Sequence, residues 1–502
     1  MQRTPHVPFG FIGGKGIFKS LERSEIHETN PVVENGANIQ QPTALTSGPG
    51  FAGFRIKSGQ ETVGRRSPSW GNRGGGDPRH HHPACLQPSK PATSHHPPPE
   101  PAAVPSNLAR HFLLFEDVLF LNHGSFGACP RPVFETYQSI QRELESQPVA
   151  FLGRELTERL RVPRVELAAY LGTSPENLVG VVNATTGLNI VAQSLDLQPG
   201  DEILTTDHEY SALEKTWAYV TGKTGARIVT VDVPMPLVSE EAFTDALRAG
   251  ITERTRVLFL SHITSPTALV FPIERIVAEA RSRGIVSVID GAHTPGHIPL
   301  DLDALGADFY SGNCHKWLMT PKGSAFLYAR PEMQDRLDPL VVSHGWTAQS
   351  RQPGARGAFG NSPFIDEIEM QGTRDPSAWL AVPSALAFRR EHDWDAVTRA
   401  CTSLAQETAA RLCALTGLEP LSASEFCAPQ MVAMPIPDCD PLVIHDALLE
   451  RYAIEIPVFK WKQQSIVRVS VQGYNSREQM DVLIDALTEL LDLVQAPSRM
   501  RS

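Results

Sequence analysis

The segment Ser311-Gly-Asn-Cys-His-Lys-Trp317 follows a predicted strand at 309–311 and precedes a Pro-Lys-Gly turn at 321–323. Lys316 in this segment is a candidate nucleophile. A lysine in an enclosed site with aromatic and cationic neighbours loses its proton more easily, as Schiff-base formation with a carbonyl group requires. Because a lone His-Lys pair is more often part of an ordinary surface, the surrounding sequence has to decide between these interpretations.

A carboxylate upstream of Lys316 supports the functional interpretation. Asp290 ends the apolar run Val286–Asp290, which is typical of a buried strand, and ligands in open α/β sheets bind beyond the carboxyl ends of the strands. A buried anion at that edge would keep a pyridine nitrogen protonated, and His293 could contact the hydroxyl of the same ring. The alternatives are a turn or capping role for Asp290 and a structural role for His293.

Three further segments could complete a binding site. The segment 183–187, Asn-Ala-Thr-Thr-Gly, lies between a predicted strand and a predicted helix, so its free N–H groups and hydroxyls could bind a phosphate. An ordinary N-cap fits this segment equally well. Tyr210 could stack on a planar cofactor or simply pack at the edge of the core. Arg468 interrupts an apolar run, so a carboxylate from the protein or from a substrate should face it.

Short apolar runs alternate with helical patterns from about residue 106 onward, which predicts a mostly parallel α/β architecture. The predicted strands lie at 178–182, 202–205, 227–233, 257–262, 286–290, 309–311 and 324–328. Helices are predicted between them, for example at 211–221 and 273–283. A long helical pattern from about 378 to 415 leads into a less regular C-terminal region, where we expect a change of domain.

The domain prediction follows from these patterns and from composition. Residues 106–375 are expected to form a large α/β domain with an N-terminal arm, 376–495 a smaller C-terminal α+β domain, and 496–502 a flexible tail. Residues 1–105 are rich in Pro, Gly and His and cannot bury enough apolar surface to fold, so we predict a disordered tail. The histidines at 80–82 are interpreted as a solvated spacer, and no metal site is predicted.

Composition limits the class of protein. The 45 Lys+Arg and 56 Asp+Glu give a formal charge of −11 without a long basic run, so nucleic acid is not an expected partner. No stretch approaches the ~20 consecutive apolar residues of a membrane-spanning helix, and we expect a cytoplasmic protein that does not bind membranes. The seven cysteines are scattered and are interpreted as reduced thiols.

Taken together, these segments resemble the class V aminotransferase group of fold type I pyridoxal-phosphate enzymes, over about residues 107–491. Three strings are especially similar to its isopenicillin N epimerase-like branch: 120–130 (FLNHGSFGACP), 261–272 (SHITSPTALVFP) and 313–324 (NCHKWLMTPKGS). The resemblance implies a large domain with a mostly parallel seven-stranded sheet and a smaller C-terminal α+β domain. It also implies pyridoxal 5′-phosphate as the cofactor and an amino acid, a small molecule, as the substrate.

The resemblance implies catalytic roles for three residues. Lys316 would hold the cofactor as a Schiff base and move the Cα proton of the substrate, Asp290 would pair with the pyridine nitrogen, and His293 would contact the ring hydroxyl. Tyr210 would stack on the ring, at the place where cysteine desulfurases have a histidine. Arg468 would bind the α-carboxylate of the substrate.

The remaining residues carried over from the family surround the phosphate group. Those within the same subunit are Ala184, Thr185, Asn313 and His315. Thr373 would reach the phosphate of the neighbouring subunit, which implies a homodimer with shared active sites.

Epimerase-like chemistry is the leading functional prediction, with a cysteine- or cystine-type C–S lyase second and an aminotransferase third. A non-catalytic binding protein with this fold is the alternative from another class. An epimerase needs a second acid on the far face of the substrate, and His123 and His208 are the candidates; His123 is also expected to contact the substrate. Residues 455–465 contain no cysteine, which disfavours a persulfide-forming desulfurase.

Overall fold

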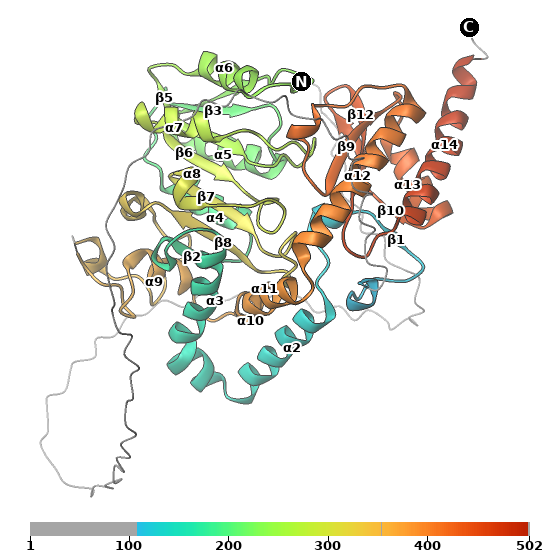
Figure 1. Ribbon diagram of the computed structural model, residues 1–502. Coiled ribbons are helices and arrows are strands. Elements are labelled where there is room, and N and C mark those ends of the chain that lie inside the picture. Colours follow the sequence, from blue (N-terminus) through green and yellow to red (C-terminus); the bar gives the residue numbers. More distant parts are fainter. Residues whose placement is uncertain (1–107, 353, 500–502) are drawn as a thin grey trace, which may run out of the picture. The chain divides into compact units, whose positions relative to one another are not determined.

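The computed structural model describes residues 108–352 and 354–499 (Figure 1). A seven-stranded sheet organises the N-terminal part of this region, in the order β2-β8-β7-β6-β5-β3-β4. Its strands are β2 (Leu178–Val181), β3 (Glu202–Thr206), β4 (Arg227–Val231), β5 (Thr255–Ser261), β6 (Val286–Asp290), β7 (Phe309–Asn313) and β8 (Ala325–Ala329). The pairs from β4 through β7 are parallel, whereas β8 is antiparallel to both of its neighbours. The seven predicted strands and the mostly parallel α/β fold are confirmed.

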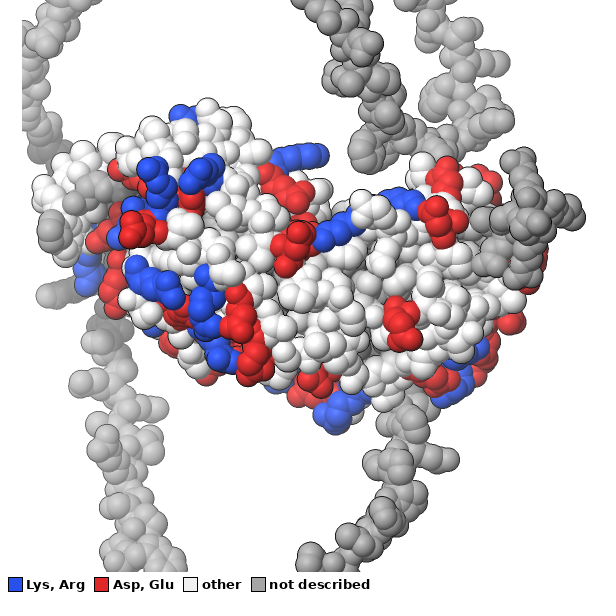
Figure 2. Space-filling model, turned by 90° about the horizontal axis from the view of Figure 1, so that it is seen from above, with Lys and Arg blue, Asp and Glu red and all other residues white. Residues whose placement is uncertain are grey.

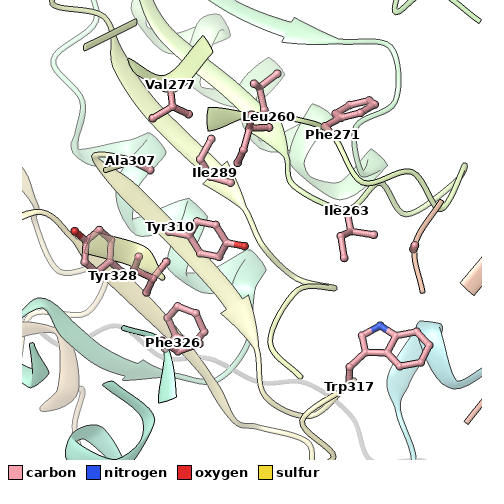
Figure 3. Close-up of a cluster of buried hydrophobic side chains, with 14 of the residues drawn as sticks. Leu260, Ile263, Phe271, Val277, Ile289, Ala307, Tyr310, Trp317, Phe326 and Tyr328 are labelled. Atoms are coloured by element: carbon pink, nitrogen blue, oxygen red, sulfur yellow. The ribbon is translucent and has the colours of Figure 1, made fainter. Parts of the chain in front are cut away.

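Helices cover both faces of this sheet, because successive residues of each buried strand point to opposite sides. In β6, Val288 packs with residues of α4 (Ala184–Ser194) and α5 (Ser211–Thr224) on one face. Ile289 packs on the other face with residues of α3 (Leu156–Tyr170), α6 (Glu240–Gly250) and α7 (Glu274–Ser282). Figure 3 shows part of the second cluster, in which Ile289, Tyr310 and Phe326 come from three neighbouring strands. Most strands of the sheet are fully buried, which explains why their sequences read as continuous apolar runs.

The helices of the N-terminal part are α1 (His123–Phe126), α2 (Arg131–Ser146), α3 (Leu156–Tyr170), α4 (Ala184–Ser194), α5 (Ser211–Thr224), α6 (Glu240–Gly250), α7 (Glu274–Ser282) and α8 (Leu302–Leu305). Those that follow the sheet are α9 (Pro363–Glu369), α10 (Ser377–Leu380) and α11 (Val382–Glu391). The long helical pattern from 378 to 415 is therefore divided among three helices: α10, α11 and α12 (Trp394–Thr416).

A smaller sheet forms in the C-terminal region, with the antiparallel order β11-β12-β9. Its strands are β9 (Met431–Ile436), β11 (Val458–Trp461) and β12 (Gln464–Ser470). Helices α12 (Trp394–Thr416), α13 (Pro441–Tyr452) and α14 (Arg477–Arg499) contribute to a second core with this sheet (Figure 1).

The N-terminal end of the described chain packs against this C-terminal region. Strand β1 (Leu119–Phe120) pairs in parallel with β10 (Ile454–Glu455), and the buried side chains of Leu108 and Phe112 belong to the C-terminal core. Helix α1 directly follows β1, so this pairing places the residues of α1 next to β12.

The predicted tail at 1–105 lies outside the described residues. Helix α14 runs through Arg499, into the segment that the sequence predicts to be a flexible tail from residue 496, because a formed helix extends by one hydrogen bond for each added residue. No helix in the described part of the chain has the length and apolar character needed to cross a membrane. On the face shown in Figure 2, basic and acidic side chains lie interspersed. Elsewhere in the described chain such side chains form ion pairs, for example Arg248 with Glu279 at 3.0 Å.

Candidate active site

The parallel strands of the large sheet end at one cavity, with a volume of about 340 Å³. Ser261 at the end of β5, Asp290 at the end of β6 and Asn313 at the end of β7 all line it. This is the edge at which open α/β sheets bind ligands. Eight of the nine residues predicted to contact the cofactor line this cavity: Ala184, Thr185, Tyr210, Asp290, His293, Asn313, His315 and Lys316.

Lys316 lies three residues beyond β7, in the connection to β8. Its Nζ is 2.9 Å from Nε2 of His293. Burial and, after it, the charge of Arg468 lower the pKa of Lys316 to about 7, against the opposing charge of Asp290. The Lys316 amine is therefore available in its uncharged, nucleophilic form near neutral pH.

The position of the proton on the His293 ring decides whether His293 donates a hydrogen bond to Lys316 or accepts one from it. The indole Nε1 of Trp317 lies 3.4 Å from Nδ1 of His293, and an indole N–H can only donate. Burial lowers the pKa of His293 well below its usual value, so the ring is neutral. A neutral ring that accepts at Nδ1 carries its proton on Nε2, which then donates to the uncharged amine of Lys316.

Asp290 is only 3% exposed, and its Oδ1 accepts a hydrogen bond of 2.9 Å from the backbone N–H of Ala292. Burial raises the pKa of Asp290 to about 6, while Lys316 and this backbone hydrogen bond lower it. Within residues 108–352 and 354–499 no second hydrogen bond reaches this carboxylate, which leaves one oxygen free to accept from a ligand.

The start of α4 borders the same cavity. Asn183 caps this helix and accepts hydrogen bonds from the backbone N–H and the hydroxyl of Thr186, at 2.8 and 3.0 Å. The Oδ1 of Asn313 accepts from the N–H of Ala184 at 2.8 Å, so β7 and α4 meet at the helix N-terminus. The remaining N–H groups and the Thr185 hydroxyl make this end of the cavity suitable for an anion.

Arg468 lies on β12 and is 5% exposed. Unlike the eight residues above, its side chain is not among those that line the cavity. Its Nη1 donates to the carbonyl of Ser265 at 2.5 Å and its Nη2 to the hydroxyl of Ser125 at 3.0 Å, and both serines line the cavity. No carboxylate in the described part of the chain pairs with this guanidinium, and its buried Nε has no hydrogen-bond partner there. Burial lowers the pKa of Arg468 to about 10, so the group remains charged at neutral pH.

Two predicted histidines lie behind the cavity wall. His123 is fully buried, with Nδ1 3.0 Å from the hydroxyl of Tyr474 and Nε2 3.1 Å from the carbonyl of Lys316. It therefore holds the backbone of Lys316 and does not line the cavity. His208 is also fully buried, next to Asp207 at 2.8 Å, and it is likewise absent from the cavity wall.

Thr373 lies apart from these residues. It is exposed and lines a different cavity, of about 140 Å³, together with His344 and Arg374. The structure does not bring Thr373 to the Lys316 of the same chain, and its expected contact with a neighbouring subunit remains a prediction.

Several cavity residues were not predicted. Ser125 and Ser265 lie within the two strings at 120–130 and 261–272, and only their shared contact with Arg468 reveals their role. Lys322 belongs to the Pro-Lys-Gly turn, which the sequence indicated only as a turn. Glu209 is buried behind Ser261 and accepts hydrogen bonds from its N–H and hydroxyl, at 2.8 and 2.6 Å. The sequence feature that could have indicated Glu209 is its position directly before Tyr210.

Comparison with known proteins identifies related sequences over most of the described chain. Residues 125–483 match the family model described as aminotransferase class V. Isopenicillin N epimerase of Amycolatopsis lactamdurans is 38% identical over 376 residues, which is 74% of this chain and 94% of that protein. A probable chloroplastic L-cysteine desulfhydrase of Arabidopsis thaliana is 29% identical over 435 residues, 80% of this chain and 88% of that protein.

Solved structures share the fold at lower sequence identity. The cysteine desulfurase CsdA of Escherichia coli has a TM-score of 0.65 and 24% identity, with 77% of this chain and 98% of that chain covered. A mutant of C-DES, with glycine covalently linked to its PLP cofactor, has a TM-score of 0.61 and 21% identity, with 74% of this chain and 97% of that chain covered.

Proposed function

The chain belongs to the class V aminotransferase family, and from this premise we propose that it is a pyridoxal-phosphate-dependent enzyme that acts at the Cα of an amino acid, as isopenicillin N epimerase does. The observation that carries the proposal is the single cavity in which Lys316, His293 and Asp290 meet. The free oxygen of Asp290 suits a pyridine N–H, and the start of α4 suits a phosphate group. The residues present therefore fit this cofactor.

Each residue then has a defined task. When bound, pyridoxal phosphate supplies an electron sink that makes the Cα proton of an amino acid removable. Asp290 would keep the proton on the pyridine nitrogen. Lys316, with a pKa of about 7, would hold the cofactor, and its amine, once the amino group of the substrate has replaced it there, would accept the Cα proton. His293 positions the Lys316 amine and would contact the ring hydroxyl, and Tyr210 would stack on the ring.

Arg468 fixes the orientation of the substrate. Its guanidinium is held by Ser125 and Ser265 and has no carboxylate partner among the described residues. An α-carboxylate can accept two parallel hydrogen bonds from such a group. This contact places the Cα of the bound amino acid in a constant position relative to Lys316.

A β-eliminating C–S lyase is the second candidate. The similarity to L-cysteine desulfhydrase favours it, and the same Lys316, Asp290 and Arg468 serve elimination as well as epimerisation. The absence of cysteine at 455–465 continues to disfavour a persulfide-forming desulfurase.

Incubation of the holoenzyme with a panel of amino acids in deuterated water distinguishes these reactions. Exchange of the Cα proton with inversion at Cα supports the epimerase, pyruvate release supports the lyase, and keto-acid formation supports the aminotransferase. Lys316→Ala should abolish all three, whereas the surface variant Lys215→Ala should leave them unchanged. A purified protein that binds no pyridoxal phosphate and exchanges no proton would contradict the proposal.

We also propose a homodimer in which Thr373 completes the site of the neighbouring subunit. Phe359, which lines the same cavity as Thr373, is 44% exposed in the single chain. Val341 at 48%, Val342 at 66% and Trp346 at 41% flank Ser343 and His344 of that cavity in the sequence. Exposed apolar side chains gathered in one part of the chain are typical of an interface. A cytoplasmic location stays a prediction.

Mixing two inactive variants tests the shared site. Heterodimers of Lys316→Ala with Thr373→Glu contain one site in which both residues are native, if Thr373 acts across the interface. Random exchange makes half of the dimers mixed, so the mixture should regain about a quarter of the native activity. If Thr373 served its own subunit, or if the protein were a monomer by light scattering, mixing would restore nothing.

A further inference from the structure

Lys322 is a cation of the cavity wall that the proposed reaction does not use. It lies in the turn at 321–323, six residues after Lys316, and its Nζ donates a hydrogen bond of 2.8 Å to the carbonyl of Gly127. Desolvation lowers the pKa of Lys322, and no carboxylate within residues 108–352 and 354–499 pairs with it. Part of the residue is exposed in the single chain, and it lines the cavity together with Asn183 and Thr185.

The position of Lys322 along the cavity follows from its contacts. Its Nζ donates to the carbonyl of Gly127, and Gly127 lies directly against the carbonyl of His315. The same segment meets the start of α4, where Asn313 accepts from the N–H of Ala184. Lys322 therefore lies at the end of the cavity that contains His315 and the start of α4. Arg468 lies towards the end that receives the substrate carboxylate.

His315 cannot supply positive charge at that end. Burial is the main cause that lowers its pKa to about 4, so its ring is neutral at pH 7. Its Nδ1 is 3.3 Å from the carbonyl of Ser324, and a carbonyl only accepts. The neutral ring therefore carries its proton on Nδ1 and has no proton on Nε2 to donate.

When the charged side chains around the cavity are matched with the charged groups of the proposed ligands, one cation of the cavity wall has no anionic partner within the described part of the protein. Asp290 matches the protonated pyridine nitrogen, and Arg468 matches the α-carboxylate. A phosphate monoester carries a charge of about −1.5 to −2 at pH 7, and the hydroxyl of Thr373 would bring no charge to it. Among the described residues of the cavity wall, Lys322 alone remains to balance this charge.

We infer that Lys322 binds the phosphate group of the cofactor and supplies its main positive charge, an inference that rests on the proposed function. The backbone of Gly127 holds the lysine ready for this contact. Gly127 has a φ of +70°, and a Cβ at this position would lie 2.0 Å from the carbonyl oxygen of His315. Its lack of a side chain thus allows α1 to approach the Lys316 segment and to offer the carbonyl that Lys322 contacts.

Cofactor titration of the apoprotein tests this inference. Lys322→Met removes the charge while keeping the length of the side chain, Lys322→Arg keeps the charge, and Lys215→Met is the surface control. A charged hydrogen bond of this kind corresponds to an approximately ten- to hundredfold change in affinity. Lys322→Met should therefore weaken pyridoxal-phosphate binding by about that factor, with Lys322→Arg and Lys215→Met close to the native protein.

Pyridoxal, which lacks the phosphate, makes the test specific. Its affinity should be the same in Lys322→Met and in the native protein, because the proposed contact is absent in both. Equal loss of affinity for both compounds, or unchanged affinity for pyridoxal phosphate, would overturn the inference. Unchanged cofactor affinity with a raised KM only for amino acids bearing a second carboxylate would assign Lys322 to the substrate instead.

The outcomes also separate this inference from the proposed function. A native protein that binds neither compound contradicts the proposed function itself. If the native protein and Lys322→Met bind pyridoxal phosphate equally tightly, only the proposed role of Lys322 is contradicted. The unfolding midpoint of each apoprotein, measured without cofactor, shows whether a variant is folded, and Lys322→Arg provides a folded comparison that keeps the charge.

Discussion

Arg468 shows how a single side chain can indicate a ligand. A guanidinium that is 5% exposed is costly to bury without an anion, and its only described partners are the neutral groups of Ser125 and Ser265. The protein thus keeps a desolvated positive charge at the cavity, where an incoming carboxylate gains the most from it.

Replacing Arg468 should therefore affect substrate binding and leave cofactor binding intact. In Arg468→Ala the KM for the amino acid should rise by about a hundredfold, since truncating one partner of a buried charge pair costs about 2–5 kcal/mol. Arg468→Lys should recover little, because an ammonium group cannot form the two parallel hydrogen bonds. Steady-state kinetics and a cofactor titration check this, and an unchanged KM would contradict the assignment.

At the scale of single residues, the sequence predicted members of the cavity correctly where a motif follows the end of a strand. Asp290, Asn313 and Lys316 could be placed together because the carboxyl ends of parallel strands meet at one edge. Lys322 and Ser125 could not, since lysine and serine are common on surfaces and their contacts join segments far apart in the chain.

The residue at the C-terminal end of helix α9 connects this helix with two other elements of the fold. Glu369 at its end pairs with Arg164 of α3 at 2.6 Å, and both side chains are 2% exposed. The other carboxylate oxygen of Glu369 accepts from the N–H of Gly180 in β2, at 3.0 Å. One buried carboxylate thus connects two helices and an edge strand of the sheet.

Removing only one partner of this pair should be costly. Glu369→Ala leaves the buried guanidinium of Arg164 without compensation, and the free energy of unfolding should fall by about 3–5 kcal/mol. The double variant Arg164→Met/Glu369→Leu should recover much of this loss, because it buries no charge. Urea unfolding of the apoproteins measures both, and equal stability of Glu369→Ala and the native protein would show that the pair contributes nothing.

The sequence predicted the strands of the large sheet to within two residues at each end, because full burial produces clear apolar runs. It did not predict the antiparallel direction of β8. Residues 314–324 are too short for the helical crossover that a parallel neighbour of β7 requires, so the chain returns directly.

The whole molecule brings the two ends of the described chain together around the cavity. Strand β1 pairs with β10, and His123 joins Tyr474 and the backbone of Lys316. Such contacts cannot be predicted from local pattern, because each depends on the packing of the complete chain. The division at residue 375 into two domains remains a prediction.

Stability at acidic pH is a property of the molecule as a whole. Five buried histidines have pKa values below 6.5, chiefly because burial disfavours their charged form; they are His123, His262, His293, His297 and His315. Between pH 4 and 6.5 the unfolded chain binds protons that the native chain does not, so stability is lost as the pH falls through this window. Each histidine contributes up to about 1.4 kcal/mol per pH unit.

Three buried carboxyl groups act in the opposite direction. Burial raises the pKa of Glu209 to about 8 and that of Asp290 to about 6, and it also raises the pKa of Glu369. Above about pH 4.5 the native chain therefore keeps protons that the unfolded chain releases. Since five histidines oppose three carboxyl groups, the free energy of unfolding of the apoprotein should fall between pH 6.5 and 5. Urea titrations measure it, and Glu209→Gln should steepen the dependence; a flat profile would contradict the prediction.

The contact of Arg468 with Ser125, which spans 343 positions, has a consequence for protein synthesis. All residues that line the cavity have been translated by Gly323, whereas Arg468 in β12 follows 145 residues later, from 323 to 468. At about 5–20 residues per second a ribosome needs about 7–29 s for that interval. The nascent chain therefore carries the whole cavity lining well before it carries the guanidinium that contacts Ser125 and Ser265, and completion of the site waits for β12.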